Sequence, residues 1–260
     1  MPRSPAATRF RHRLRCALGL VMAWALRRRS RPYVGDRKTA VLVLAPHPDD
    51  ETLGCAGLIA QARQAGRDVS IAYLTDGSAS HPEHPRVGPA EIARMRRAEA
   101  IAATGLLGVA PEHLHFLGAP DGTLDRLDPA AAAALTESLV RLLSALRPAE
   151  IFLPARRDGS SEHDAAFPLI LAAAAQAGRQ PRVLEYPVWA RWNPRRLARP
   201  LLLSRRVWRI AAPDNGALKR RALAVYASQF EALAPWEQPA LAPEFAAFFS
   251  SPEEFFFETD

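Results

Sequence analysis

The chain has 260 residues, enough for one large domain, and 48% of them are hydrophobic, enough to fill a core. Its two cysteines, Cys16 and Cys55, are too few for a disulfide framework and are expected to be free thiols in a reducing compartment. Residues 1–38 hold 11 lysines and arginines and one acid, whereas the rest holds 23 basic and 26 acidic residues. The body therefore has no net attraction for phosphate, which argues against nucleic acid as a partner.

Residues 1–38 are a basic arm around an apolar run, Cys16 to Leu26, that arginines flank on both sides. The run is about half of the ~20 residues that span a bilayer, and no small-residue cleavage pattern follows it. The pattern predicts an amphipathic helix, which either packs on the domain or rests on anionic lipid as a peripheral membrane contact. We expect a cytoplasmic protein, with the inner membrane face as the alternative location.

From residue 39 to 232, short apolar runs typical of strands alternate with segments of helical spacing. Strands are predicted at 39–45, 68–77, 113–118, 150–155, 182–190 and 201–210, and Pro187 suggests that 182–190 is an edge strand. Helices are predicted at 52–66, 89–108, 129–146, from about His163 to 177, and 216–232.

This alternation predicts one α/β domain, 39–232, with a Rossmann-like, doubly wound, mostly parallel sheet and helices on both faces. The tail, 233–260, is rich in proline and phenylalanine and has no clear period. In such sheets ligands bind beyond the carboxyl ends of the strands. The loops at that edge are 45–51, 75–88, 118–123 and 155–164.

The first of these loops places His47, Asp49, Asp50 and Glu51 within five residues. Three neighbouring carboxylates repel one another, so a cation is expected beside them. Adjacent residues of an extended segment point to opposite sides, so Asp49 and Asp50 should have different tasks. One would join His47 on a metal and the other would face a bound water. Imidazole with carboxylate suits zinc or another divalent transition metal.

A third ligand must come from another segment, and His163 is the best candidate. It lies in "RRDGSSEHD", 156–164, after the fourth strand and at the same sheet edge as His47. Ser161 with Asp164 resembles a helix-capping arrangement that would fix this loop. The alternative is a histidine that merely starts a helix. The other histidines of the body, expected at the surface, in the site lining or in the core, are His81, His84, His113 and His115.

Four stretches resemble the LmbE-like, or PIG-L, zinc-dependent de-N-acetylases: "APHPDDETLGCAG", "LTDG", "HFLGAPDG" and "DGSSEHDAA". The resemblance covers about residues 39–230. It implies that His47, Asp50 and His163 bind zinc and that Asp49 is the general base. The implied reaction is hydrolysis of an acetamide on an N-acetylglucosamine-type sugar or glycoconjugate, a small-molecule partner. Which acceptor carries the acetamide stays open.

The resemblance also implies substrate contacts at Asp121, in "APDG", and at Arg96, whose alternative role is a helix-surface pair with Glu99. Family members often have histidine where this chain has Ser160, and that histidine helps to stabilise the oxyanion. Because losing one such donor costs about 10²–10³ in rate, altered activity is expected. Glu162 stands where aspartate is usual, and either carboxylate could orient an imidazole.

The sequence leaves two alternative functions. The first is a degenerate member that binds metal and sugar without useful turnover, which Ser160 motivates. The second is a magnesium-dependent glycosyl or phosphoryl transferase, in which the acidic cluster would hold a nucleotide diphosphate. No glycine-rich phosphate loop with a following lysine supports the second, and His163 favours zinc over magnesium.

Overall fold

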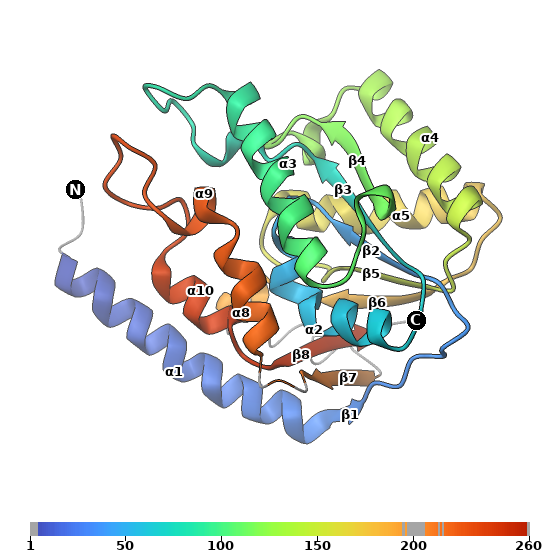
Figure 1. Cartoon of the computed structure of the whole chain (residues 1–260), viewed down its shortest axis with the longest axis horizontal. Helices are drawn as coiled ribbons and strands as arrows, with labels where there is room; N and C mark the ends of the chain where they lie inside the picture. Colours follow the sequence, from blue (N-terminus) through green and yellow to red (C-terminus); the bar gives the residue numbers. More distant parts are fainter. Residues whose placement is uncertain (1–4, 194–195, 197–205, 213, 215, 259–260) are drawn as a thin grey trace.

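Eight strands of the described chain form one sheet, in the order β1-β7-β8-β6-β5-β2-β3-β4 (Figure 1). The computed structural model describes residues 5–193, 196, 206–212, 214 and 216–258, with side chains from residue 17 onward. The strands are β1 (Ser30–Pro32), β2 (Val41–Ala45), β3 (Val69–Thr75), β4 (Leu114–Ala119), β5 (Glu150–Pro154), β6 (Arg182–Tyr186), β7 (Arg206–Ala211) and β8 (Glu253–Glu258).

Helices flank the sheet on both sides (Figure 1). The α-helices are α1 (Pro5–Arg29), α2 (Asp50–Gln64), α3 (Pro89–Leu106), α4 (Pro129–Leu146), α5 (Ser161–Gln176), α6 (Trp189–Trp192), α8 (Ala217–Ala224), α9 (Ala227–Phe230) and α10 (Pro243–Phe249). Three short 3-10 helices are η1 (Ser78–Ser80), η2 (Pro111–His113) and η3 (Leu124–Arg126).

The sheet is parallel except for one strand. Strand β8 pairs antiparallel with both β6 and β7, and the remaining pairings are parallel. The segment β4-β3-β2-β5-β6 winds outward in both directions from β2, so the strand order reverses between β2 and β5. The predicted α/β fold with a mostly parallel sheet and helices on both faces is confirmed. The reversal is where ligands bind in such sheets.

Strand β2 is fixed from both of its faces. All five of its residues are buried. Val41 and Val43 pack in the cluster that contains α2, α3 and α8 residues, whereas Leu42 and Leu44 pack in the cluster with α4 and α5. This alternation follows from the two-residue repeat of a strand. The loop after β2 therefore starts from a backbone that two layers of helix hold in place.

The tail of the chain contributes a strand to the interior of the sheet. Strand β8 lies between β6 and β7, so the prediction that 182–190 is an edge strand is wrong. Pro187 follows the last residue of β6 and interrupts no pairing. The residues of the phenylalanine run alternate between faces: Phe256 joins the cluster with α2, whereas Phe255 and Phe257 pack in a separate cluster with Leu26 of α1.

Two other predicted segments differ in extent. The predicted helix 216–232 is divided into α8 and α9, which a short break around Tyr226 separates. In the predicted strand 201–210, β7 begins at Arg206, and residues 201–205 lie outside the described part. Cys55 is buried and free, and the side chain of Cys16 lies outside the described residues.

Among the described residues, α4 is the one helix whose length and apolar composition would suffice to cross a membrane. Three of its leucines form a buried stripe, which packs in the core cluster that also contains Leu42 and Leu44 of β2: Leu135, Leu139 and Leu143. A stripe with this spacing is what an amphipathic helix buries against its own domain.

Candidate metal centre

The loop between β2 and α2 places His47, Asp49 and Asp50 at the reversal of strand order. Asp49 precedes α2 with a φ of 136°, a left-handed backbone that non-glycine residues rarely adopt. Its N–H donates to the Glu51 carboxylate at 3.0 Å, and its carbonyl accepts the N–H of Leu53 at 2.8 Å. These bonds hold a strained turn of the kind that occurs at functional sites.

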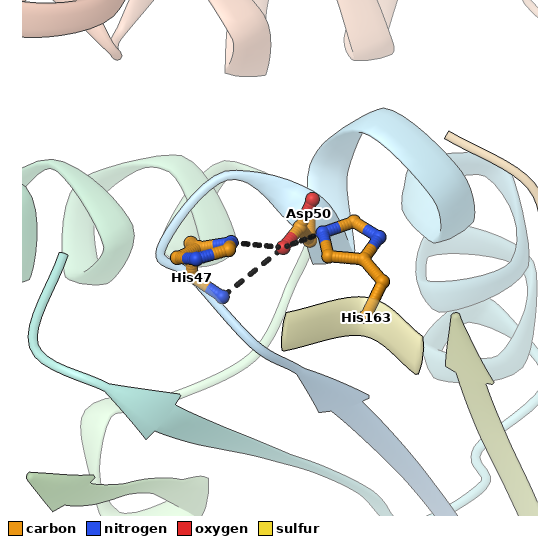
Figure 2. Close-up of side chains that lie close together, drawn as sticks. All are labelled: His47, Asp50 and His163. Carbon is orange, nitrogen blue, oxygen red and sulfur yellow. Dashed lines mark hydrogen bonds and ion pairs between the residues drawn. The ribbon is translucent and has the colours of Figure 1, made fainter. Parts of the chain in front are cut away.

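Asp50 lies between two imidazoles (Figure 2). One oxygen, Oδ2, is 3.1 Å from Nδ1 of His47 and 3.2 Å from Nε2 of His163, and it also accepts the backbone N–H of His47 at 3.0 Å. The three side chains offer ligand atoms that all lie within 4.8 Å of one another. His163 stands in the first turn of α5, after β5, so the parallel strands β2 and β5 bring the two histidines to one edge.

A carboxylate contacts the second nitrogen of each ring. Asp158 Oδ2 lies 2.7 Å from Nδ1 of His163, and Glu162 Oε2 lies 2.7 Å from Nε2 of His47. Such outer carboxylates fix the tautomer and orientation of metal-binding histidines. The remaining nitrogen of His163, Nε2, is buried and has no hydrogen-bond partner among the described atoms. An orphaned imidazole nitrogen beside a buried carboxylate fits a metal ligand.

A second group, His47 with Asp121 and Glu162, also has ligand atoms within 4.8 Å of one another. It offers one imidazole and two carboxylates. A metal bound there would take Nε2 of His47, the nitrogen that Glu162 contacts. Nε2 of His163 would then stay without a partner. The group around Asp50 satisfies both rings and is therefore the better metal site.

The electrostatics of the group also favour a cation. Burial by itself lowers the pKa of His163, but neighbouring carboxylates, Asp50 foremost, raise it to about 9. The pKa of His47 is raised against the effect of burial by hydrogen bonds to Asp121, Asp50 and Glu162. Burial would raise the pKa of Asp50, but the imidazoles hold it well below its usual range. The carboxylates thus create a negative potential that attracts protons or a metal to the same nitrogens.

Asp49 lines the same pocket as His47 and pairs with a residue of α3. Its Oδ2 lies 3.1 Å from a guanidinium nitrogen of Arg96, and both side chains are almost fully buried. The same nitrogen of Arg96 donates to the carbonyl of Pro48. Burial raises the pKa of Asp49 to about 7, and the charge of Arg96 opposes that rise. The two neighbouring aspartates therefore have separate partners.

Arg96 does not form a helix-surface pair with Glu99, the alternative role that the sequence suggests. Arg96 is 3% exposed and lines the pocket. Glu99 instead accepts the N–H of Ser228 at 2.7 Å and its hydroxyl at 2.6 Å, which ties α9 to α3.

Asp121 and Ser160, the other predicted substrate contacts, both line the pocket. Asp121 Oδ1 is 3.2 Å from Nε2 of His47, and its Oδ2 accepts the N–H of Ala79 at 2.8 Å. Ser160 occupies the position that precedes α5 and makes no side-chain capping bond. The predicted cap of Ser161 with Asp164 is therefore wrong: Ser161 is already helical, and the Asp164 N–H donates to the carbonyl of Ser160.

The four other histidines of the body lie outside this group. His81 stacks on Trp236 with ring centroids 5.4 Å apart, and His84 contacts the carbonyl of Leu233 through Nε2 at 3.1 Å. Both hold the chain around residues 233–236 and neither lines the pocket. His113 and His115 lie at the start of β4, the opposite end of the strands from His47.

The pocket over the site has a volume of about 510 Å³. Its polar lining residues include the aspartates, Glu162, His47 and Arg96. Its apolar lining residues include Leu53, Val188, Trp189, Leu241 and Phe245. A lining that mixes carboxylates with aromatic side chains suits an amino sugar, whose hydroxyls form hydrogen bonds and whose ring packs on apolar surface.

Asp158 is the site residue that sequence analysis missed. It is fully buried and accepts the N–H groups of Val188, Trp189 and Ala190 at 3.0, 2.9 and 2.9 Å, in addition to contacting His163. Its position five residues before His163, in a polar loop after a strand, was the available signal. Asp158 therefore holds both the His163 ring and the backbone at the start of α6 in place.

We expect Asp158→Asn to weaken metal affinity about 10–100-fold, the usual cost of losing an outer-shell partner. An amide at this position can donate to Nδ1 of His163, which would place the ring proton on Nε2, the nitrogen that faces Asp50. Competition with a chelating dye measures the affinity. Asp164→Asn, the same change at an exposed position next to His163, is the control and should leave affinity unchanged.

The fold and the buried His-Asp-His group define a doubly wound α/β protein with a candidate metal centre. The model of the PIG-L family, described as GlcNAc-PI de-N-acetylase, matches residues 42–174, which contain all three residues of that group. This match covers half of the sequence, and the chain belongs to the PIG-L family of de-N-acetylases.

A curated relative from Kineococcus radiotolerans, 1D-myo-inositol 2-acetamido-2-deoxy-alpha-D-glucopyranoside deacetylase, is 33% identical over 125 residues, which are 45% of this chain and 34% of the relative. The chain thus spans about a third of the length of the curated relative it matches.

Solved structures share the fold. N,N'-diacetylchitobiose deacetylase from Pyrococcus horikoshii has a TM-score of 0.56 and 20% identity, over 72% of this chain and 69% of its own. The 4-carboxy-2-hydroxymuconate hydratase GalB from Pseudomonas putida has a TM-score of 0.62 and 16% identity, over 82% and 83%. Because these two proteins catalyse different reactions, the fold alone does not define the reaction, and the site must.

Proposed function

We propose that the chain is a zinc-dependent N-deacetylase that removes acetyl from an N-acetylglucosamine-type sugar or glycoconjugate. The observation that carries this proposal is that Asp50 contacts two imidazoles, while Asp49, the next residue, lines the same pocket and pairs with Arg96. Membership of a family described as GlcNAc-PI de-N-acetylase, and the activity named for the curated relative, support it.

His47, Asp50 and His163 would hold the metal. Two imidazoles and a carboxylate are a usual set of three protein ligands in catalytic zinc sites, and another divalent transition metal would fit the same set. The orphaned Nε2 of His163 and the outer carboxylates of Asp158 and Glu162 support this assignment. When bound, zinc supplies Lewis acidity, which polarises the acetamide carbonyl and makes a water molecule more acidic.

Asp49 would be the general base. Its carboxylate takes a proton from the attacking water as the new C–O bond forms at the acetamide carbon. It then gives this proton to the nitrogen as the C–N bond breaks, so that the products are the free amine and acetic acid, which ionises to acetate. Arg96, 3.1 Å away, holds the carboxylate in place and keeps it separate from the metal ligands.

The substrate would lie in the pocket over the site. Asp121 is placed to accept a hydrogen bond from a sugar hydroxyl, because it lines the pocket while its backbone and imidazole contacts fix its orientation. Arg96 and Ser160 would contact the same substrate from α3 and from the start of α5. Trp189, which also lines the pocket, would pack its ring on the sugar.

The test is acetate release by the zinc-loaded protein. The substrates are free N-acetylglucosamine, an alkyl N-acetylglucosaminide and the acetamido-glucosyl inositol named for the curated relative. We expect acetate and free amine in equal amounts from at least one of them, and loss of the reaction after chelation. Stoichiometric zinc without acetate from any of the three would contradict the proposal.

Ser160 gives a second, independent prediction. Because a single oxyanion donor is worth about 10²–10³ in rate, a histidine at this position should recover part of it, and we expect Ser160→His to raise kcat by about tenfold or more. The Ser160 side chain makes no capping hydrogen bond to α5, so replacing it with histidine removes no capping bond from the helix. A conservative Ser160→Thr variant is the control. A lower kcat in the histidine variant would contradict this prediction and would mean that the contact of Ser160 with the substrate is worth more than a histidine donor at this position.

A further inference from the structure

Helix α1 carries an exposed apolar stripe. Of the seven large hydrophobic side chains exposed in the described part of the chain, four belong to this helix: Leu18, Leu20, Val21 and Trp24. Leu20 is 70% exposed, and Val21 and Trp24 are each 60% exposed. Residues 20, 21 and 24 share one side of a helix, so these side chains form a continuous surface. Figure 1 shows α1 along the outer border of the molecule.

The opposite side of α1 is the side that packs on the body. Leu26 is fully buried in a cluster with Val207 and Phe255. Gly19 lies so close to Phe248 of α10 that an added Cβ would be 2.4 Å from the ring. The helix is therefore docked through one face, and the stripe of Leu20, Val21 and Trp24 is not needed for that contact.

The charge of α1 points to an anionic partner. The helix contains seven arginines and no acidic residue, in two groups, residues 9–15 and 27–29, on either side of the apolar run. Arg28 lies over the Trp24 ring, 5.1 Å from its centroid, at the border of the stripe. Arg27 pairs with Glu253 at 3.2 Å yet stays 64% exposed. Apolar residues between basic groups are the pattern of a helix that lies in the surface of an anionic membrane.

We propose that α1 docks the protein on an anionic phospholipid surface. Leu20, Val21 and Trp24 would enter the boundary between headgroups and acyl chains, and the arginines would contact lipid phosphates. The apolar run of residues 16–26 rises about 17 Å in a helix, against about 30 Å of hydrocarbon in a bilayer, so the helix lies in the surface and does not cross it.

A second copy of the chain is a poorer occupant of this stripe. Two α1 helices packed face to face would bring arginine groups of both copies together, parallel or antiparallel, and α1 offers no acidic residue to offset them. The lipid surface supplies the negative charge that a second α1 lacks. Docking in this way does not depend on the proposed deacetylase activity.

The test is sedimentation of the full chain with vesicles. One set contains equal parts phosphatidylglycerol and phosphatidylcholine, and the other contains phosphatidylcholine alone. We expect binding to the anionic vesicles that falls as salt rises, and at least about tenfold weaker binding of a Leu20→Ser, Trp24→Ser double variant. An Arg28→Gln variant should bind the anionic vesicles about fivefold more weakly.

A Val34→Ser, Leu171→Ser double variant is the matched control, because it removes two exposed hydrophobic side chains outside α1. It should bind as the wild type does, and thermal unfolding should be alike in all variants. Equal binding of the Leu20/Trp24 variant and the wild type would overturn the proposal, as would equal binding to both vesicle types. Absence of vesicle binding, together with a dimer that the Leu20/Trp24 variant loses, would assign the stripe to a second copy.

Discussion

An Asp49→Asn variant is expected to release acetate with a kcat about 10²–10⁴ lower than the wild type while keeping its metal, the usual contribution of a general base. Asparagine has the same shape and tolerates the positive φ of this turn, so the loop should keep its conformation. It cannot accept the water proton. The ligand contacts of Asp50 with His47 and His163 involve no atom of the Asp49 side chain and should persist.

Two measurements on one preparation check this prediction. Metal content should be the same in variant and wild type, and KM should change much less than kcat, because the lost interaction belongs to the transition state. Asp164→Asn, an exposed carboxylate close in sequence, controls for the loss of one charge. If the variant lost its metal as well, Asp49 would be part of the ligand set. If kcat were unchanged, another group would be the base.

The α/β fold was predictable because its central part is encoded locally. The five buried residues of β2 form an uninterrupted apolar run, and the helices after it have their own period. Strand β8 was not predictable in this way. Its Glu254 accepts hydrogen bonds from the N–H groups of Gly57 and Leu58 in α2. It also forms an ion pair with Lys219 in α8, and all of these contacts are buried. Such contacts join residues about 35 to 200 positions apart and leave no local pattern.

The part of the candidate site that was predictable from the sequence is the part that follows from the order of the strands in the sheet. Parallel strands β2 and β5 are neighbours, so residues after them must meet at one edge, and this placed His47 near His163. The contacts of Asp158 and Arg96 depend on side-chain directions that topology does not give. Arg96 sits three residues before Glu99, a spacing that favours a surface pair, yet it turns inward because the buried Asp49 carboxylate needs a cation.

Replacing His163 with alanine should remove the metal and reduce kcat by about 10³ or more, because Lewis acidity contributes several kcal/mol to the transition state. His163 is fully buried and its Nε2 faces Asp50, so no solvent-exposed side chain can take its place. His113→Ala, a change of the same kind at the opposite end of the strands, should keep both metal and activity.

Thermal unfolding separates metal loss from a general loss of stability, which alanine at a buried position also causes. A ligand at 100 times its Kd stabilises the native state by about 2.7 kcal/mol, so chelation should lower the Tm of the wild type by about 5–10 °C. The Tm of His163→Ala should respond neither to chelator nor to added zinc, whereas that of His113→Ala should respond as the wild type does. A zinc-dependent Tm in His163→Ala would place the metal elsewhere, and the group of His47, Asp121 and Glu162 would then be the site to test.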